Sequence, residues 1–408
     1  MQVAQKIGFF IDIIDMFKRL LPIAEARASL VPLGADPFNV VFDGFTSPTE
    51  ASVNGKTVLL AGTNNYLGLT FDPDAIEAAC EAMRLSGTGT TGSRMANGTF
   101  SCHRALETDL AEFFQCTSSI VFSTGFLANL GVIAALIGPD DPVLIDGDCH
   151  ASIYDGCRMS GGRTIRFRHN DPHDLEKRLK RLGGAAEDAL VIVEGIYSMF
   201  GDRAPLRELV EVTKGFGACL MVDEAHSLGV LGAHGRGLAE EAGCEDEVDI
   251  LVGTFSKSLG TIGGFCVSRH AELDLIRYAS RAYIFTASPS PATMASVRVA
   301  LKKLAEGSAL RERLWENALT LYQGLLDMGF SLGPEPSPVI AVLMPSREKT
   351  LFAWKALLDR GVYVNLVLPP ATPGGVSLLR CSVSAAHTPD QIGFMLYAFA
   401  SIGGLARK

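Results

Sequence analysis

The sequence predicts an α/β protein, with a mostly parallel sheet covered by helices in a large domain and a smaller α+β domain at the C-terminal end. Three observations predict this fold class. Short apolar runs alternate with amphipathic stretches, 408 residues suffice for two domains, and a turn-rich Ser-Pro-Ser-Pro segment at 288–291 separates two kinds of pattern. We expect an N-terminal arm over residues 1–45, a large domain over 46–290 and a small domain over 291–408.

The arm carries an amphipathic helical pattern over residues 7–23, where apolar residues recur at three- and four-residue spacing. Such a helix packs either on the protein body or a second subunit, or it lies on a membrane surface. The charges in this stretch are mixed and few, without the basic face that anionic lipid favours. We therefore favour packing, and keep peripheral membrane contact as an added hypothesis.

Short apolar runs predict the strands of the large domain, with helices between several of them. Parallel sheets bind ligands beyond the carboxyl ends of their strands, so polar residues that follow these runs are candidate site residues. Strands are expected at 119–122, 143–146, 189–194, 218–223, 250–253 and 264–268, and helices at 127–136, 171–182 and 205–216.

The small domain is expected to begin with a long helical pattern that is interrupted near Gly307. Its remaining pattern mixes strands and helices, as in an α+β domain. The expected elements are a helical stretch over 292–326, a strand over 338–344, a helix over 348–358, short strands around Tyr363 and Leu379, and a final helix from about Pro389.

Composition excludes several classes of protein. With 36 basic against 45 acidic side chains and no basic stripe, the chain is poorly suited to phosphate backbones, so no nucleic-acid partner is expected. No apolar run reaches the ~18 residues of a membrane-spanning helix. The nine cysteines are scattered without a Cys-x-x-Cys pair, and the arm lacks a secretory cleavage site. We expect a cytoplasmic protein with reduced thiols.

Two motifs suggest chemistry that their context excludes. Residues 87–92 read Gly-Thr-Gly-Thr-Thr-Gly, with Glu107 near the distance of a ribose-binding acid, but a predicted helix precedes them where a dinucleotide loop needs a strand. His169 and His173 have helical metal spacing, but Pro172 lies between them and no third ligand is near. We expect a solvated loop there, and no metal site.

Polar residues instead follow four of the predicted strands, at the edge where ligands bind. One group opens the helix at 127–136, as a phosphate site does. The residues are Asp223 and His226 after one strand, Ser123 and Gly125 after a second, His150 after a third, and Thr254, Ser256 and Lys257 after a fourth.

This combination fits the chemistry of pyridoxal phosphate. The cofactor needs a lysine for its Schiff base and a carboxylate to keep its pyridine nitrogen protonated, which Lys257 and Asp223 supply. Its phosphate needs donors, which are available from Ser123, Gly125, Thr254 and Ser256.

Long motifs then connect the chain to a known family. Residues 253–264 read Gly-Thr-Phe-Ser-Lys-Ser-Leu-Gly-Thr-Ile-Gly-Gly, 150–156 His-Ala-Ser-Ile-Tyr-Asp-Gly, 91–99 Thr-Gly-Ser-Arg-Met-Ala-Asn-Gly-Thr, and 369–373 Pro-Pro-Ala-Thr-Pro. From about Asp36 onward the sequence resembles the α-oxoamine synthases, which are fold-type I pyridoxal phosphate enzymes. These condense an amino acid with an acyl thioester and release carbon dioxide. The 369–373 motif favours the bacterial branch that uses serine over relatives that use glycine or alanine.

The resemblance implies roles around the cofactor ring. Lys257 would form the Schiff base and act as acid and base at Cα, and Asp223 would pair with the pyridine nitrogen. His226 would bond the phenolic oxygen. His150 would stack on one ring face, with Ala225 against the other.

It also implies how the phosphate is bound. The backbone of Gly125 and Phe126, with Thr254 and Ser256, would surround it, and Thr286 would reach the phosphate of a neighbouring subunit. An active site shared in this way implies a homodimer.

For the substrates, Arg380 would bind the carboxylate of the amino acid, and Asn65 would lie near it. The implied reaction joins L-serine to a long-chain acyl thioester, palmitoyl-CoA or an acyl carrier protein donor, giving 3-ketosphinganine as the first step of sphingolipid synthesis. One departure is Leu368, where bacterial relatives commonly carry arginine. Two alternatives remain: a synthase that uses glycine or alanine, and a non-catalytic partner subunit of the same fold.

Overall fold

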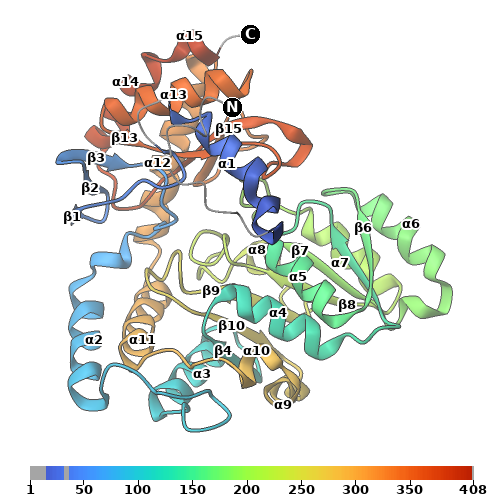
Figure 1. Ribbon diagram of the computed structural model, residues 1–408. Helices are drawn as coiled ribbons and strands as arrows, with labels where there is room; N and C mark the ends of the chain where they lie inside the picture. The colour runs from blue at the N-terminus through green and yellow to red at the C-terminus, as the bar shows by residue number, and fades with distance from the viewer. Residues whose placement is uncertain (1–14, 32–35, 407–408) are drawn as a thin grey trace.

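A seven-stranded sheet forms the centre of the large lobe, with strand order β4-β10-β9-β8-β7-β5-β6 (Figure 1). The computed structural model describes residues 15–31 and 36–406. Only β10 runs against the other strands, antiparallel to both β4 and β9, so the prediction of a mostly parallel sheet is confirmed. The strands are β4 (Ser118–Phe122), β5 (Pro142–Asp146), β6 (Arg163–Phe167), β7 (Leu190–Glu194), β8 (Cys219–Asp223), β9 (Ile250–Thr254) and β10 (Gly264–Ser268).

Helices cover both faces of this sheet, because its buried strands are apolar on both sides. On β7, Leu190 and Ile192 join a core with α4 (Gly125–Leu136) and α5 (Ala151–Ser160). Val191 and Val193 point the other way, as alternate residues of a strand do. They join the core of α3 (Ser101–Phe113), α6 (Pro172–Leu182), α7 (Leu206–Gly215) and α11 (Pro291–Glu306).

The small lobe is built on an antiparallel sheet with order β11-β12-β15-β14. Its core surrounds the buried Trp354. The predicted interruption near Gly307 is confirmed, since α11 ends at Glu306 and the next helix begins at Ala309. The elements are α12 (Ala309–Asp327), β11 (Ser331–Leu332), β12 (Val339–Met344), α13 (Arg347–Asp359), β14 (Asn365–Val367), β15 (Ser377–Ser382), α14 (Pro389–Ala400) and α15 (Gly403–Ala406).

A third sheet joins an early segment to the C-terminal part of the chain. β1 (Gly44–Ser47), β2 (Glu50–Val53) and β3 (Lys56–Leu60) form a meander, and β13 (Val362–Tyr363) pairs in parallel with β3. The predicted boundaries assign residues 46–60 to the large domain. We propose instead that this segment goes with the small lobe, while the boundary at residue 290 stays a prediction.

Short 3₁₀-helices, labelled η, and several α-helices complete the large lobe. They are η3 (Leu69–Phe71), α2 (Pro73–Ser86), η4 (Gly183–Ala186), α8 (Leu238–Glu241), η5 (Ala271–Leu275), α9 (Ile276–Ala279) and α10 (Arg281–Ile284).

The glycine motif at residues 87–92 follows the helix α2, as the sequence predicts. Glu107 on α3 is tied up in a buried ion-pair network, with Oε1 2.9 Å from both Arg94 and Arg277. Its carboxylate therefore stabilises the fold through these ion pairs and does not serve as a ribose-binding acid.

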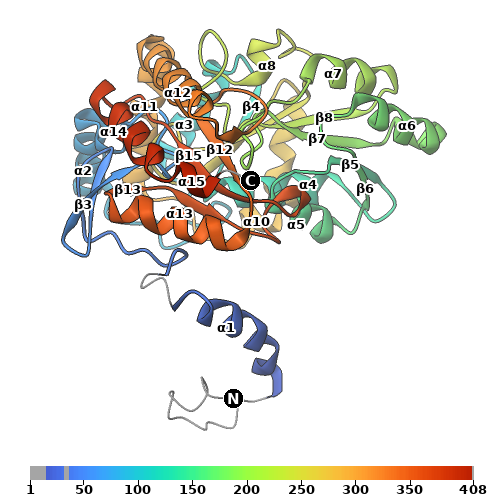
Figure 2. The same cartoon turned by 90° about the horizontal axis from the view of Figure 1, so that it is seen from above.

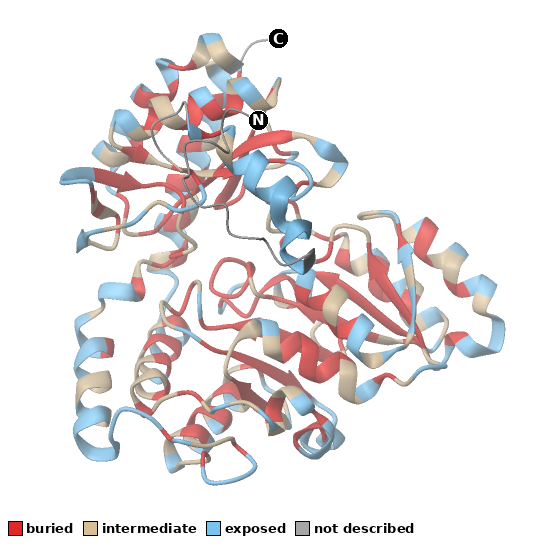
Figure 3. Ribbon diagram, in the orientation of Figure 1, coloured by how far each residue is buried: buried red, intermediate tan, exposed pale blue. Residues whose placement is uncertain are grey.

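The arm projects from the body as η1 (Asp15–Leu20) and α1 (Leu21–Ala28) (Figure 2). Residues 7–14 of the predicted 7–23 helix lie outside the described residues. The described part is exposed along most of its length (Figure 3), including Met16, Phe17 and Ile23 at 74%, 56% and 65%. Among the described residues, no helix is long and apolar enough to cross a membrane.

Candidate active site

A cavity of about 220 Å³ lies where the carboxyl ends of the parallel strands meet. Nine of the predicted residues line it, and four others that the sequence did not single out complete the lining. The predicted ones are Gly125, Phe126, His150, Asp223, Ala225, His226, Thr254, Ser256 and Lys257; the others are Thr124, Asn129, Ser152 and Glu194.

Four predicted residues lie outside this lining. The Ser123 hydroxyl donates to the Ala287 carbonyl at 2.5 Å and so is engaged away from the cavity. Thr286 follows α10 and is half-buried. Asn65 is buried, and its Oδ1 has no hydrogen-bond partner. Arg380, on β15, is buried and donates from Nε to the Ser198 carbonyl at 2.6 Å.

Asp223, at the end of β8, is oriented by two hydrogen bonds. Its Oδ1 accepts from the Ala225 backbone N–H at 2.9 Å, and its Oδ2 accepts from Asn129 Nδ2 at 2.7 Å. Asn129 Nδ2 also lies 2.9 Å from Ser152 Oγ, which is 2.8 Å from His150 Nδ1. The carboxylate and the imidazole therefore belong to one network, in which Asn129 and Ser152 are the connecting residues.

Glu194 is buried at the end of β7, in register with Asp223 on the neighbouring strand. Its Oε1 accepts the backbone N–H of His150. Burial first, and then the nearby Asp223, raise the pKa of Glu194 well above its usual range. The shift favours the protonated form of Glu194, which lessens the repulsion between two carboxyl groups at this edge of the sheet.

Burial favours the neutral form of both cavity histidines. Burial, followed by the positive charges of Lys257 and Arg380, lowers the pKa of His226 well below its usual range. Loss of water contact also lowers the pKa of His150, although Asp223 opposes this shift. The Ser152 backbone N–H donates to His150 Nδ1 at 3.2 Å, so the ring proton of His150 sits on Nε2.

The N-terminus of α4 lies at the cavity and has the chemistry to hold an anion. Thr124 caps the helix, its Oγ1 accepting from the Leu127 N–H at 3.0 Å, while the first N–H groups of a helix have no partner within it. Thr254 Oγ1 and Ser256 Oγ lie 3.1 Å apart next to it. A Cβ on Gly125 would lie 2.9 Å from Thr254 Cβ, so only glycine permits this close approach.

Lys257 follows β9, in the loop that its flanking glycines and hydroxyls predict. Removal from water lowers the pKa of its amine to about 8, although Asp223 and Glu194 oppose the shift. A lysine that ionises near neutral pH is a better nucleophile than an exposed one, because more of it is present as the free amine.

The rate at which cofactor-free protein binds pyridoxal phosphate is therefore expected to depend on pH. Below the pKa the fraction of neutral amine grows about tenfold per pH unit, and it levels off above about pH 8. Stopped-flow absorbance from about pH 6 to 10 measures this rate, with Lys257→Ala as the control. A rate that still rises at pH 10 would indicate an ordinary lysine.

The prediction of a solvated loop is wrong for His169. Its Nδ1 lies 2.8 Å from Asp146 Oδ1 and its Nε2 lies 2.7 Å from Asp202 Oδ2. Although burial opposes it, these two carboxylates raise the pKa of His169 to about 10. The charged ring ties β5 to the loop that carries Ser198. In the described part of the chain, no cluster of three or more His, Cys, Asp or Glu residues could bind a metal.

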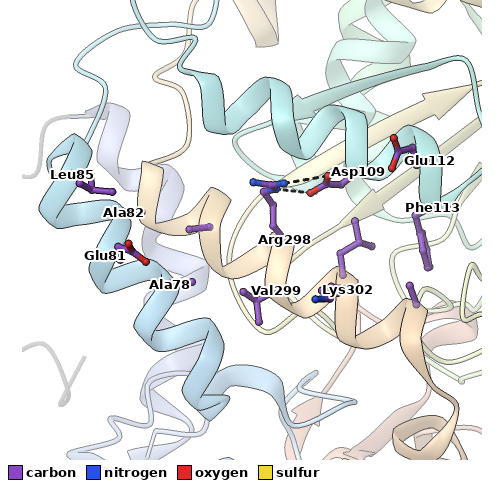
Figure 4. Close-up of a pocket in the computed structure, with 13 residues that line it drawn as sticks. Ala78, Glu81, Ala82, Leu85, Asp109, Glu112, Phe113, Arg298, Val299 and Lys302 are labelled. Atoms are coloured by element: carbon purple, nitrogen blue, oxygen red, sulfur yellow. Dashed lines mark hydrogen bonds and ion pairs between the residues drawn. The ribbon is translucent and has the colours of Figure 1, made fainter.

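A larger cavity of about 740 Å³ lies between α2, α3 and α11. Figure 4 shows Arg298 on α11 reaching Asp109 on α3, with Nε 2.5 Å from Oδ2. None of the predicted site residues lines it. The strand-end cavity, although smaller, is the one that the predicted cofactor-binding residues line.

A strand-end lysine and aspartate on a mostly parallel sheet, beside a helix N-terminus, define the class of fold-type I pyridoxal phosphate enzymes. Residues 56–398 match the model of the family "Aminotransferase class I and II", and the chain belongs to this family.

Comparison with individual proteins gives a narrower group of relatives than the family model does. A serine palmitoyltransferase (SPT) of Caulobacter vibrioides is 54% identical over 388 residues, covering 95% of this chain and 96% of the relative. One of Sphingomonas paucimobilis is 50% identical over 395 residues, covering 96% and 93%. A high-resolution structure of SPT with its PLP internal aldimine has a TM-score of 0.93 and 49% identity, covering 96% of this chain and 99% of that one.

The residues present fit pyridoxal phosphate. Lys257 offers an amine with a lowered pKa, Asp223 a carboxylate with fixed orientation, and the start of α4 an anion site. Ring-binding and phosphate-binding groups thus lie around one cavity.

Proposed function

We propose that this protein is a pyridoxal phosphate enzyme that condenses L-serine with a long-chain acyl thioester, palmitoyl-CoA, to give 3-ketosphinganine and carbon dioxide. The observation that carries the proposal is the cavity at the strand ends, where Lys257, Asp223, His150 and His226 meet beside the start of α4. The serine palmitoyltransferases that cover nearly the whole chain at 50–54% identity support the choice of substrates.

Each side chain has a role in this proposal. Lys257 binds the cofactor covalently and then moves the proton at the α-carbon of serine. Asp223 keeps the pyridine nitrogen protonated, and His226 donates to the phenolic oxygen. His150 and Ala225, which both line the cavity, would hold the ring between them. Bound pyridoxal phosphate supplies a ring that withdraws electrons from the bonds at that α-carbon.

Polar groups at the edge of the cavity position the phosphate of the cofactor and the carboxylate of the substrate. The backbone N–H groups of Gly125 and Phe126, with the hydroxyls of Thr254 and Ser256, bind the phosphate. Ser123 contributes less to phosphate binding than its place in the sequence implies, because its hydroxyl donates to the Ala287 carbonyl.

Arg380 binds the serine carboxylate in this proposal, for which its planar fork is suited. Its Nε and Nη1 already bond to Ser198 and Asn64, so its orientation is fixed before substrate arrives. Asn65 follows Asn64 in the chain, and its buried Oδ1 has no hydrogen-bond partner. Leu368 is buried in the small-lobe core, where an arginine would place a charge.

The test is a comparison of amino acids and acyl donors. Purified holoenzyme is titrated with serine, glycine and alanine while its visible spectrum is recorded, and product is assayed with palmitoyl-CoA, shorter acyl-CoAs and acyl carrier protein thioesters. Serine is expected to give the largest spectral change and palmitoyl-CoA the most product. A stronger response to glycine or alanine would favour another synthase, and no turnover would favour a non-catalytic partner subunit.

The protein is further proposed to act as a homodimer with a shared active site. Thr286 supports this, because it lies outside the cavity of its own chain. Thr286→Ala is expected to weaken pyridoxal phosphate binding by about tenfold through loss of one hydrogen bond to a charged group. Equilibrium dialysis measures the affinity, and ultracentrifugation the assembly. A monomer with full affinity would contradict the proposal.

We also propose that the protein is cytoplasmic and that the exposed apolar residues of the arm pack on the second subunit. Deleting residues 2–31 is then expected to raise the dissociation constant of the dimer, as measured by ultracentrifugation. A matched flotation assay with vesicles of phosphatidylglycerol and phosphatidylethanolamine tests the membrane hypothesis. An unchanged dimer with lost flotation would indicate that the arm binds lipid instead.

A further inference from the structure

Tyr66 is a fully buried residue that the proposed mechanism does not use. Its hydroxyl lies 2.7 Å from Nδ1 of His226, a residue 160 positions further along the chain. The backbone around Tyr66 is also fixed, because its carbonyl accepts the N–H of Ala385 at 2.7 Å. A rigid hydroxyl therefore lies behind a histidine of the cavity.

The direction of this hydrogen bond follows from the state of both groups. Burial raises the pKa of the Tyr66 phenol, so it retains its proton. Burial lowers the pKa of His226, so the ring carries one proton only. The other acceptor near the hydroxyl is Asn64 Oδ1, at the longer distance of 3.4 Å, and that oxygen already receives a hydrogen bond from Arg380.

With Tyr66 as the donor, Nδ1 of His226 is an acceptor and the ring proton sits on Nε2. His226 lines the cavity, and among the described residues no protein group hydrogen-bonds to Nε2. The ring then presents an N–H donor to the cavity. In the opposite tautomer it would present a lone pair, which repels an anionic oxygen.

We propose that Tyr66 is a positioning residue that holds His226 in the Nε2–H tautomer, so that its ring can donate to the phenolic oxygen of the cofactor. This inference rests on the proposed function for the identity of that oxygen. The tautomer itself is a property of the protein alone.

Tyr66 further connects His226 to the group proposed to bind the substrate carboxylate. Asn64 Oδ1, near the Tyr66 hydroxyl, accepts from Arg380 Nη1 at 3.1 Å. The positive charge of Arg380 also lowers the pKa of His226, after burial and Lys257. A contiguous set of contacts thus runs from the cofactor side of the cavity to β15.

The test uses Tyr66→Phe, which removes only the hydroxyl. In the holoenzyme, the pH midpoint of the visible cofactor band is expected to rise by roughly 0.5 to 1 unit, because a weaker donor leaves more negative charge on the phenolic oxygen. Tyr283→Phe is the matched control. Tyr283 is also buried, but its hydroxyl bonds Arg277 outside the cavity, so the midpoint should not change.

A second measurement does not depend on the cofactor. In ¹⁵N-histidine-labelled protein without cofactor, the His226 resonances, assigned with His226→Asn, should show the Nε2–H tautomer in the unsubstituted protein and a mixture in Tyr66→Phe. An Nδ1–H tautomer in the unsubstituted protein overturns the inference, even if the variant fails to fold. So does a Tyr66→Phe protein with an unchanged tautomer and midpoint. Failure of the serine assay with the expected tautomer would instead reject the proposed function alone.

Discussion

Replacing Lys257 by alanine is expected to abolish the borohydride-sensitive visible band of the holoenzyme and to lower product formation by a factor on the order of 10⁴. The side chain comes from the loop after β9 and lines the strand-end cavity, with an amine whose pKa is lowered to about 8. Alanine removes both the covalent attachment of the cofactor and the group that moves the α-proton. Absorbance spectra before and after borohydride, with mass-spectrometric detection of product, measure the two losses separately.

Lys214→Ala is the matched control for this experiment. Lys214 is also partly buried and pairs with Asp249 at 2.5 Å, but it lies at the opposite end of the sheet, where Asp249 accepts the N–H of Leu220 near the start of β8. It should retain the band and the turnover. If Lys257→Ala also retained both, the assignment of the site would be wrong.

Asp223→Asn should have the next largest effect, a fall in turnover of about 10²- to 10³-fold with the protein still folded. The amide matches the carboxylate in shape but carries no charge, so it no longer stabilises a protonated pyridine nitrogen. It can accept only one of the two hydrogen bonds that Ala225 and Asn129 donate to the carboxylate.

Turnover, circular dichroism and cofactor affinity distinguish the chemical effect of this change from a structural one. Asp249→Asn makes the same substitution at a carboxylate outside the cavity and should leave turnover unchanged. An Asp223→Asn enzyme with full turnover would show that the charge of Asp223 is not required.

The large-lobe strands were predictable because parallel strands buried on both faces are uninterrupted apolar runs, as in β7 and β8. β6 was not, since Arg163–Phe167 lies at the edge of the sheet and three of its five residues are polar, so it is no uninterrupted apolar run. The pairing of β3 with β13 could not be foreseen, because it depends on contacts between segments far apart in the sequence.

The residues of the candidate site also divide into those that the sequence could predict and those that it could not. Residues that directly follow a strand, such as Asp223 and Lys257, were predictable from the geometry of parallel sheets. Asn129 was not, because it lies inside a helix and its partner comes from β8. Tyr66 belongs to a segment whose role appears only when His226 is placed beside it. Both polar side chains were missed because their function depends on a partner, which sequence spacing does not reveal.

The pairing of β3 with β13 also has a consequence for synthesis of the chain. Leu59 pairs with Val362, so roughly 300 residues must be translated before the edge of β3 is covered, about 15 to 60 s at ordinary rates. During that time Val58, Leu59 and Leu60, all buried in the finished protein, belong to a strand with one open edge. The nascent chain therefore carries a segment prone to aggregation on the ribosome, and a ribosome stalled before residue 362 would leave it uncovered.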